Sequence, residues 1–244
     1  MAEPTDRAAF YALSPGGWRD YWSLLHPPYT LWHLSYVAIG ASLAPTISWR
    51  WLGETLLAFF LAIGLAAHAL DELTGRPLRT RIPDRVLWAI AVVGLGGAIA
   101  VGVDGAVQVS TWIVVFIVVG GFLVVAYNLE LFGGLFHSDL WFALAWGAFP
   151  ALTGFFAQTG EVTVAAVFVA LGCAALSAAQ RMLSTPVRRL RRQAVGVQGE
   201  IELGDGTREA IDAKTLRAAP EGALRWMCVA MPVLAAGLLL AKEL

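Results

Sequence analysis

Four polar residues at the end of an apolar stretch have the types and spacing of a phosphate or metal site. His68, Glu72 and Arg76 recur every four residues, so a helix would place them on one face. Asp71 lies beside Glu72, and carboxylate oxygens are the ligands that Mg²⁺ prefers. Arginines pair with phosphate oxygens, and the segment supplies Arg76, Arg79 and Arg81. The segment therefore predicts an anion site with Mg²⁺ held by Asp71 and Glu72, unless a Glu72–Arg76 ion pair merely ends the helix.

A run of arginines further along the chain could serve the same site. Ser184-Thr185-Pro186 is typical of the start of a helix, and four basic residues follow: Arg188, Arg189, Arg191 and Arg192. This run predicts contact with anionic lipid headgroups at a membrane surface, or a grip on a substrate diphosphate.

A polar segment that contains neither Lys nor Arg could act on a second substrate. It carries four residues with hydrogen-bonding or titratable side chains: Asn128, Glu130, His137 and Asp139. Side chains of these types can orient a substrate or remove a proton from it. Ordinary polarity where a helix end meets water is the alternative role.

Composition identifies the medium in which these elements must fold. Hydrophobic residues make up 58% of the chain and charged residues 14%, against roughly 25% charged in soluble domains. Seven apolar stretches could each cross a hydrocarbon core of roughly 30 Å; they cover about 30–47, 51–70, 86–103, 107–127, 140–158, 162–182 and 224–241. Backbone groups in lipid must be satisfied internally, and the stretches lack the alternation of barrel strands. We therefore predict an all-α polytopic membrane protein with about seven transmembrane helices.

The distribution of basic residues predicts the orientation. Two lie before the first stretch, four in the 71–85 segment and nine in the 181–225 segment, so 15 of the 17 Lys and Arg residues share one side. Only Arg50 and Lys242 fall on the other side. Because cytoplasmic loops carry the excess of Lys and Arg, we expect an integral protein of the cytoplasmic membrane, with its amino terminus inside and its carboxyl terminus outside. Membrane lipids are then its first partners, and nucleic-acid binding is not expected.

The segments outside the apolar stretches divide the chain into four parts. Residues 1–28 predict a cytoplasmic segment with an amphipathic helix, because aromatic residues recur there at helical spacing. Residues 29–182 are expected to form a six-helix membrane domain, 183–222 a basic cytoplasmic loop and 223–244 a seventh transmembrane helix. In that loop, apolar and polar residues alternate up to Gly204-Asp205-Gly206, which predicts a small β-hairpin between helices six and seven. Two strands are only marginally stable alone, so the hairpin is expected to rest on the membrane domain or on a protein partner at 183–222.

The layout resembles the UbiA superfamily of intramembrane prenyltransferases over about residues 26–182. The shared features are an entry segment with proline (His26-Pro27-Pro28), an acidic motif before an Arg-Pro step (Asp71-Glu72 to Arg76-Pro77) and a Tyr at the end of helix four (Tyr127-Asn128). A fifth helix rich in small residues follows, from Gly147 to Gly160. The resemblance implies a UbiA-like bundle with its site on the cytoplasmic side.

The resemblance also implies an activity, the transfer of an isoprenoid group from a prenyl diphosphate to a lipophilic or aromatic acceptor. The expected catalytic residues are Asp71, Glu72, Tyr127, Asn128, Glu130, His137 and Asp139. The expected substrate-binding residues are His68, Arg76, Arg79, Arg81, Gln180, Arg181, Arg188 and Arg189. Where the family has a second acidic motif this chain reads Gln180-Arg181 and is basic, and the first motif keeps only Asp71 in register. A catalytically silent UbiA-like lipid-binding or scaffolding protein is therefore the alternative.

The charge distribution generates a test of topology. A reporter inserted at residue 205 should be cytoplasmic, and one placed after the last apolar stretch should be external. The reason is that the side of the membrane protein with the excess of basic residues faces the cytoplasm. Fusions to alkaline phosphatase, which is active outside, and to a fluorescent protein, which matures inside, check both positions. Finding both reporters on the same side would remove the seventh span, and finding each on the side opposite to the expected one would invert the orientation.

Overall fold

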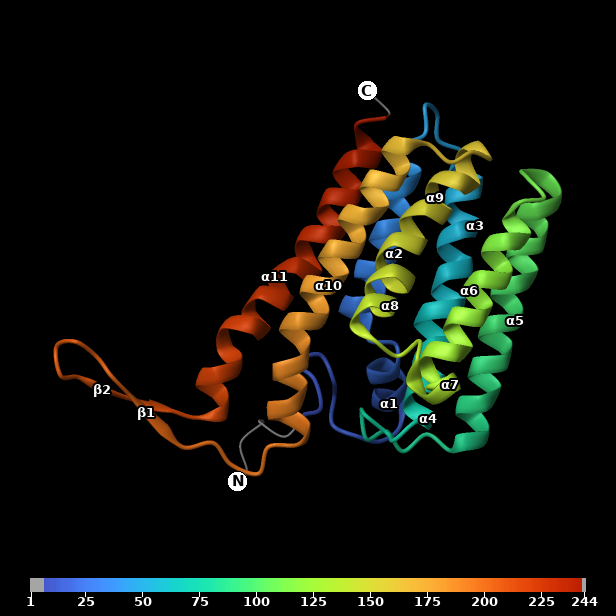
Figure 1. Cartoon of the computed structure of the whole chain (residues 1–244). Helices are drawn as coiled ribbons and strands as arrows, with labels where there is room; N and C mark the ends of the chain where they lie inside the picture. The colour runs from blue at the N-terminus through green and yellow to red at the C-terminus, as the bar shows by residue number, and fades with distance from the viewer. Residues whose placement is uncertain (1–6, 243–244) are drawn as a thin grey trace.

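Long helices that lie side by side make up most of the structure, and a two-stranded hairpin projects from one end (Figure 1). The computed structural model describes residues 7–242. In chain order, with η for a π-helical segment, the elements are α1 Trp18–Leu24, α2 Pro27–Ala41, α3 Trp49–Phe59, η2 Phe60–Ala67, α4 His68–Leu73, α5 Asp84–Gln108, α6 Ile113–Asn128, α7 Leu131–Gly134, α8 Asp139–Ala143, η3 Leu144–Ala148, α9 Phe149–Thr159, α10 Val164–Arg192, β1 Gly199–Glu202, β2 Arg208–Ile211 and α11 Ala213–Leu240.

The apolar stretches all overlap with helices, which supports the prediction of a helical membrane protein. Within the described residues, five helical runs are long and apolar enough to cross a membrane: Trp49–Leu73, Asp84–Gln108, Asp139–Thr159, Val164–Arg192 and Ala213–Leu240. Two expected spans correspond to shorter helices, the 16-residue α6 and the 15-residue α2. The count of seven spans therefore stays a prediction.

Several predicted helix boundaries are wrong. The first expected span runs to 47, but α2 ends at Ala41. The turn after α5 lies at 109–112, beyond the expected 104–106. The predicted helix start at Ser184-Thr185-Pro186 is also wrong, because α10 continues through Pro186 to Arg192. The hydroxyls of Ser184 and Thr185 both donate to the carbonyl of Arg181, one turn earlier in the same helix, instead of capping a new one.

The predicted hairpin is confirmed, with shorter strands. β1 and β2 pair antiparallel, with Gly199 opposite Ile211 and Glu202 opposite Arg208. Arg208 also forms ion pairs with Glu200 and Glu202 on the facing strand. The basic segment around the hairpin is shorter than expected, since α10 ends at Arg192 and α11 already begins at Ala213. Asp212 fixes that start, because its carboxylate accepts a hydrogen bond from the backbone N–H of Thr215.

The centre of the bundle is a close contact between α2 and α9. A Cβ atom on Gly40 would collide with the carbonyl of Ala151, and one on Gly154 would collide with the carbonyl of Val37. Glycine at both positions therefore lets the two backbones touch, as small residues do between membrane helices. This contact fixes α2 against the run that contains η3 and α9.

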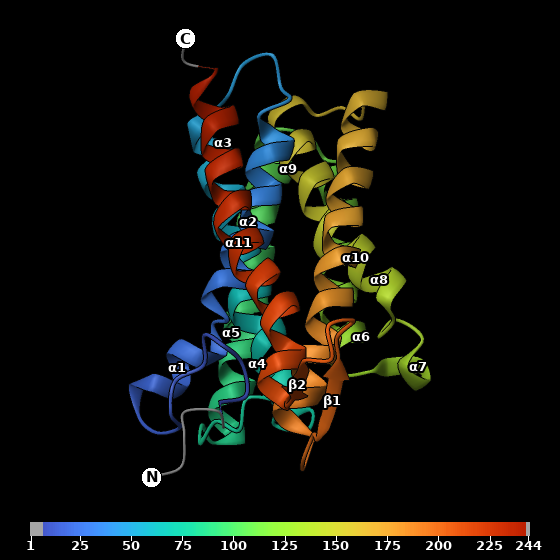
Figure 2. The same ribbon diagram turned by 90° about the vertical axis from the view of Figure 1, so that its left-hand side faces the viewer.

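The two ends of the bundle differ in their elements. Figure 1 and Figure 2 place α1, α4, α7 and the hairpin at one end, and the carboxyl-terminal end of α11 at the opposite end. The arginines of the 76–85 and 181–192 segments belong to the first end, as the charge count predicts. Trp18, Tyr21 and Trp22 of α1 are exposed there, in agreement with the predicted amphipathic helix.

Candidate functional site

A polar pocket of about 560 Å³ lies at the end of the bundle that carries α1. Six parts of the chain line it: residues 8–11, the start of α2, the run from η2 to α4, the end of α6 with the following segment, the run α8–η3, and the last turns of α10. Segments far apart in the sequence therefore converge on one space.

The pocket brings together ten of the predicted site residues. These are His68, Asp71, Tyr127, Asn128, Glu130, His137, Gln180, Arg181, Arg188 and Arg189. Five others do not line it: Glu72, Arg76, Arg79, Arg81 and Asp139. Asp139 lies at the exposed start of α8, where its carboxylate forms an ion pair with Arg181 at 2.9 Å.

Glu72 is a structural residue, and its predicted pairing with Arg76 is wrong. Its side chain is 1% exposed. One carboxylate oxygen accepts from the backbone N–H of Leu78 at 2.9 Å, and the other accepts from the N–H and hydroxyl of Thr80 at 2.8 and 2.9 Å. Arg76 pairs instead with Asp84. The reason is that α4 ends at Leu73 and Gly75 adopts φ 84°, so the chain leaves the helix before the expected i, i+4 partner is reached.

Mg²⁺ does not fit the two carboxylates as they are placed. Both oxygens of Glu72 already accept hydrogen bonds from the 78–80 backbone, which leaves only Asp71 facing the pocket. Within residues 7–242, no group of three His, Cys, Asp or Glu side chains could hold a metal ion. A divalent cation needs several oxygen ligands, so this pair would not hold one firmly.

The side of the pocket that α10 forms is basic, and the spacing of the arginines along the helix explains how they reach it. Arg181, Arg188 and Arg192 are seven and four residues apart, so they lie along one face, and all three line the pocket. Arg191 lies roughly 100° around the helix from Arg192 and forms a buried two-pronged ion pair with Glu221 of α11. Arg191 therefore has a structural role, whereas the other arginines of the predicted basic run line the pocket.

All four histidines of the chain line the pocket, and three have a fixed ring orientation. The Nδ1 atoms of His33, His68 and His137 lie within hydrogen-bond distance of the carbonyls of Trp146, Gly64 and Tyr127. A carbonyl can only accept, so each Nδ1 carries the proton and donates it. When neutral, each ring therefore keeps Nε2 as a hydrogen-bond acceptor.

The sequence did not indicate that residues 8–11 line the pocket. The ring of His26 stacks on that of His68, with centroids 4.1 Å apart, and its Nδ1 lies 2.7 Å from the hydroxyl of Tyr11. Burial raises the pKa of Tyr11, and burial together with His68 lowers the pKa of His26, so both groups are neutral at pH 7. Arg192, which belongs to the basic run predicted to bind a headgroup or a diphosphate, lines the pocket as well.

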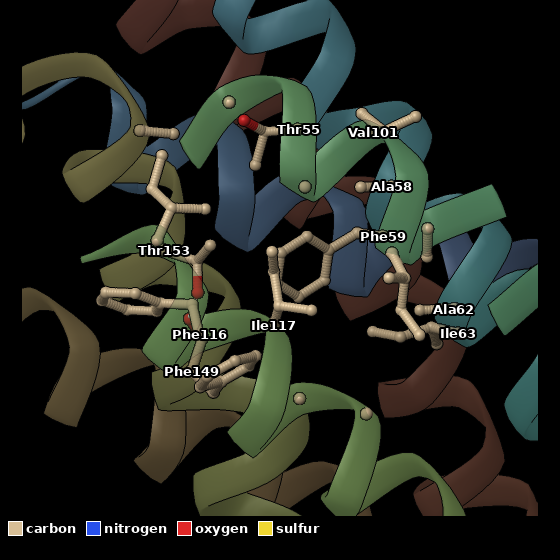
Figure 3. Close-up of a pocket in the computed structure, with 18 of the residues that line it drawn as sticks. Thr55, Ala58, Phe59, Ala62, Ile63, Val101, Phe116, Ile117, Phe149 and Thr153 are labelled. Atoms are coloured by element: carbon tan, nitrogen blue, oxygen red, sulfur yellow. The ribbon is translucent and has the colours of Figure 1, made fainter. Parts of the chain in front are cut away.

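An apolar pocket lies beside the polar one, between α3, η2, α5, α6, η3 and α9 (Figure 3). Phe59, Phe116 and Phe149 project into it, together with the small side chains of Ala58 and Ala62. A further group of glycines on α5 and α6 leaves room in its wall. Its volume is about 120 Å³, and its lining has the apolar character that a hydrocarbon chain requires.

Two residues belong to the walls of both the polar and the apolar pocket. Ile63 of η2 and Trp146 of η3 line both of them. Both residues belong to π-helical segments, whose wider turns are frequent at functional sites. The two pockets therefore meet where these segments do, beside His33.

Comparisons with models of protein families, with curated proteins and with solved structures find no match for this chain. The chemistry of the two pockets therefore carries the functional assignment.

The different surroundings of Asp71 and Glu72 generate a prediction. Glu72→Gln replaces an accepting oxygen with an N–H₂ group that faces backbone donors, so it should lower the free energy of unfolding by about 1–3 kcal/mol. Asp71→Asn, which changes a side chain facing the pocket, should change that free energy by less than about 0.5 kcal/mol. Denaturant titration of the two purified variants in detergent checks the difference. Equal stability of both variants would contradict the structural role of Glu72.

Proposed function

We propose that the chain is a divergent UbiA-like protein that binds an isoprenoid diphosphate and transfers the isoprenoid to a lipophilic or aromatic acceptor. One observation carries the proposal: a pocket lined by arginines lies next to an apolar pocket, and Ile63 and Trp146 belong to the walls of both. Such a pair of sites suits a ligand with an anionic head and a hydrocarbon tail. The head would lie against α10, and the tail between α3, α5, α6 and α9.

The basic wall supplies the chemistry that a diphosphate needs. Arg181, Arg188, Arg189 and Arg192 line the pocket, against two carboxylates, those of Asp71 and Glu130. Guanidinium groups bind phosphate oxygens with two parallel hydrogen bonds and stay charged at all physiological pH values. They would also stabilise the negative charge that develops on diphosphate as it leaves.

The transfer itself can be written with these residues. The bond between C1 of the isoprenoid and the diphosphate oxygen breaks, and the electron pair leaves with diphosphate, which the arginines hold. The aromatic faces of Phe142 and Trp146, next to the junction, would stabilise the allylic cation. The acceptor forms the new bond to C1 and loses a proton to Asp71 or to a histidine Nε2. Asn128, Glu130 and His137 would orient the acceptor.

The same proposal includes the place of the protein in the cell. The arginine-rich end of the bundle would face the cytoplasm, in the cytoplasmic membrane, with seven spans and the carboxyl terminus outside. The excess of basic residues at the pocket end supports this orientation. Water-soluble diphosphate product would then be released into the cytoplasm.

A catalytically silent lipid-binding or scaffolding protein is the second candidate. It is favoured by the fact that Glu72 is engaged with the backbone of residues 78–80 and that Asp139 pairs with Arg181, so two predicted catalytic carboxylates are used elsewhere. Mass spectrometry of the lipid that copurifies with the protein separates the two candidates. An isoprenoid diphosphate or a prenylated product supports the transferase, and phospholipid alone supports the scaffold.

The arginine wall generates a prediction about the anionic head. Arg188→Lys keeps the charge but loses the planar two-pronged donor, so it should weaken the binding of geranylgeranyl thiodiphosphate by about tenfold, or about 1.4 kcal/mol. Arg208→Lys, in the exposed hairpin, is the matched control and should leave the dissociation constant unchanged. Titration of a fluorescent analogue measures both. If the two variants bind alike, Arg188 does not hold the head.

The apolar pocket generates a prediction about the tail. Gly121 lines it, and a Cβ there would meet no atom within 4 Å, so Gly121→Leu fills the space without disturbing a helix contact. We expect this change to weaken the binding of geranylgeranyl diphosphate by about tenfold or more and to leave the binding of the short dimethylallyl diphosphate unchanged. Gly172→Leu on α10 is the control, because its Cβ also meets nothing within 4 Å and it lies outside the pocket. Equal loss for both chain lengths would place the tail elsewhere.

A further inference from the structure

Residues 7–13, which we call the strap, close one side of the polar pocket. Ala8, Ala9, Phe10 and Tyr11 all line it. The strap has little secondary structure of its own, so its position depends on side chains that reach it from the bundle. Those contacts come from α1, the start of α2, α10 and α11.

Most of the contacts that hold the strap are polar. Arg191 and Arg192 of α10 donate to the carbonyls of Arg7 and Ala8, at 3.3 and 3.1 Å. The hydroxyl of Tyr11 bonds with His26 at 2.7 Å. Further along, the backbone N–H of Leu13 donates to the hydroxyl of Ser23 in α1 at 2.9 Å.

An aromatic contact adds to these bonds. The guanidinium of Arg225 in α11 lies 5.2 Å from the ring of Phe10, and that ring also meets Tyr29 edge-on at 6.1 Å. Individual contacts of these kinds are weak, so the strap can open without unfolding of the bundle.

Arg192 belongs both to the strap contacts and to the pocket wall. Its Nε holds the carbonyl of Ala8, while the same side chain lines the pocket. Within residues 7–242, neither of its terminal nitrogens donates a hydrogen bond to a protein group. Those two nitrogens are the donors that a phosphate oxygen would take. A single guanidinium can therefore bind the strap and an anion at the same time.

We propose that the strap is a lid that an anion in the pocket locks shut through Arg192. An anion on the terminal nitrogens fixes the guanidinium in the position in which Nε holds Ala8, so binding and closure reinforce each other. The inference rests on the proposed function only in requiring a phosphate-bearing ligand in this pocket. Closure would keep water from the allylic cation, which water would otherwise convert to an alcohol.

The coupling is reciprocal and can be measured without a known acceptor. If the anion stabilises the closed strap, then a closed strap must raise the affinity for the anion by the same factor. Inorganic diphosphate is the probe, because it carries the anionic head and no tail. Binding is measured by ³¹P NMR, and the strap is followed by amide hydrogen exchange with mass spectrometry in detergent-solubilised full-length protein.

We expect saturating diphosphate to slow exchange of the 7–17 segment by about tenfold, while the exposed hairpin 199–211 exchanges as before. Arg192→Gln, examined at its own saturating concentration, should lose this protection. Arg225→Gln is the matched control, because it removes a strap contact outside the pocket. Exchange of the 7–17 segment should become faster both with and without diphosphate, and diphosphate should still slow it by about tenfold. Tyr11→Phe should open the strap and weaken diphosphate binding together.

The outcomes separate the lid from the proposed function. Bound diphosphate with unchanged exchange at 7–17 overturns the lid and leaves the anion site standing. Protection that persists in Arg192→Gln overturns the role of Arg192 as the link. No detectable binding of diphosphate by the unmodified protein overturns both the anion site and the lid.

Discussion

The carbonyl of Trp146 links the packing of the helices to the geometry of the pocket. Pro150 has no N–H, so it cannot donate to the carbonyl four residues earlier, which is that of Trp146. Nδ1 of His33 donates to this carbonyl at 2.9 Å, and such a hydrogen bond between helices is favourable in an apolar surrounding. The close contact of α2 with α9 at Gly40 and Gly154 brings His33 within reach. The proline, the glycines and the histidine thus form one arrangement, which places Trp146 at the junction of the two pockets.

Much of the fold follows from the sequence because its main determinants are local. Length and hydropathy predict the helices, and Gly204-Asp205-Gly206 predicts the hairpin, whose turn the structure places between β1 and β2. Helix boundaries were predicted less well, and one of the failures is at a proline. Pro186 lies inside α10 because the surrounding helix is stabilised by α11, partly through the buried Arg191–Glu221 pair. A window of sequence around Pro186 does not contain Glu221, so this tertiary contribution could not be read from it.

Within the 68–76 segment, helical spacing predicted only part of the candidate site. Asp71 and His68 face the pocket as that spacing predicts. Glu72 and Arg76 do not line it, because the chain leaves the helix at Gly75 and folds back over the carboxylate of Glu72. Tyr11 could not have been found from spacing, since its contact with His26 depends on a left-handed backbone at His26, with φ 45°. Non-glycine residues adopt that conformation rarely, and the local sequence does not predict it.

Electrostatics explains why such a pocket favours an anionic ligand. Four arginines line it together with two carboxylates, and the Arg181 side chain is shared with Asp139 outside the pocket. The excess positive charge lies in a partly desolvated space, where like charges repel more strongly than in water. A dianionic or trianionic head would relieve that repulsion, and its tail would fill the adjoining apolar pocket. Arg192 lines the pocket and also holds the strap in place, so the binding of the ligand and its protection from water would both depend on one arginine.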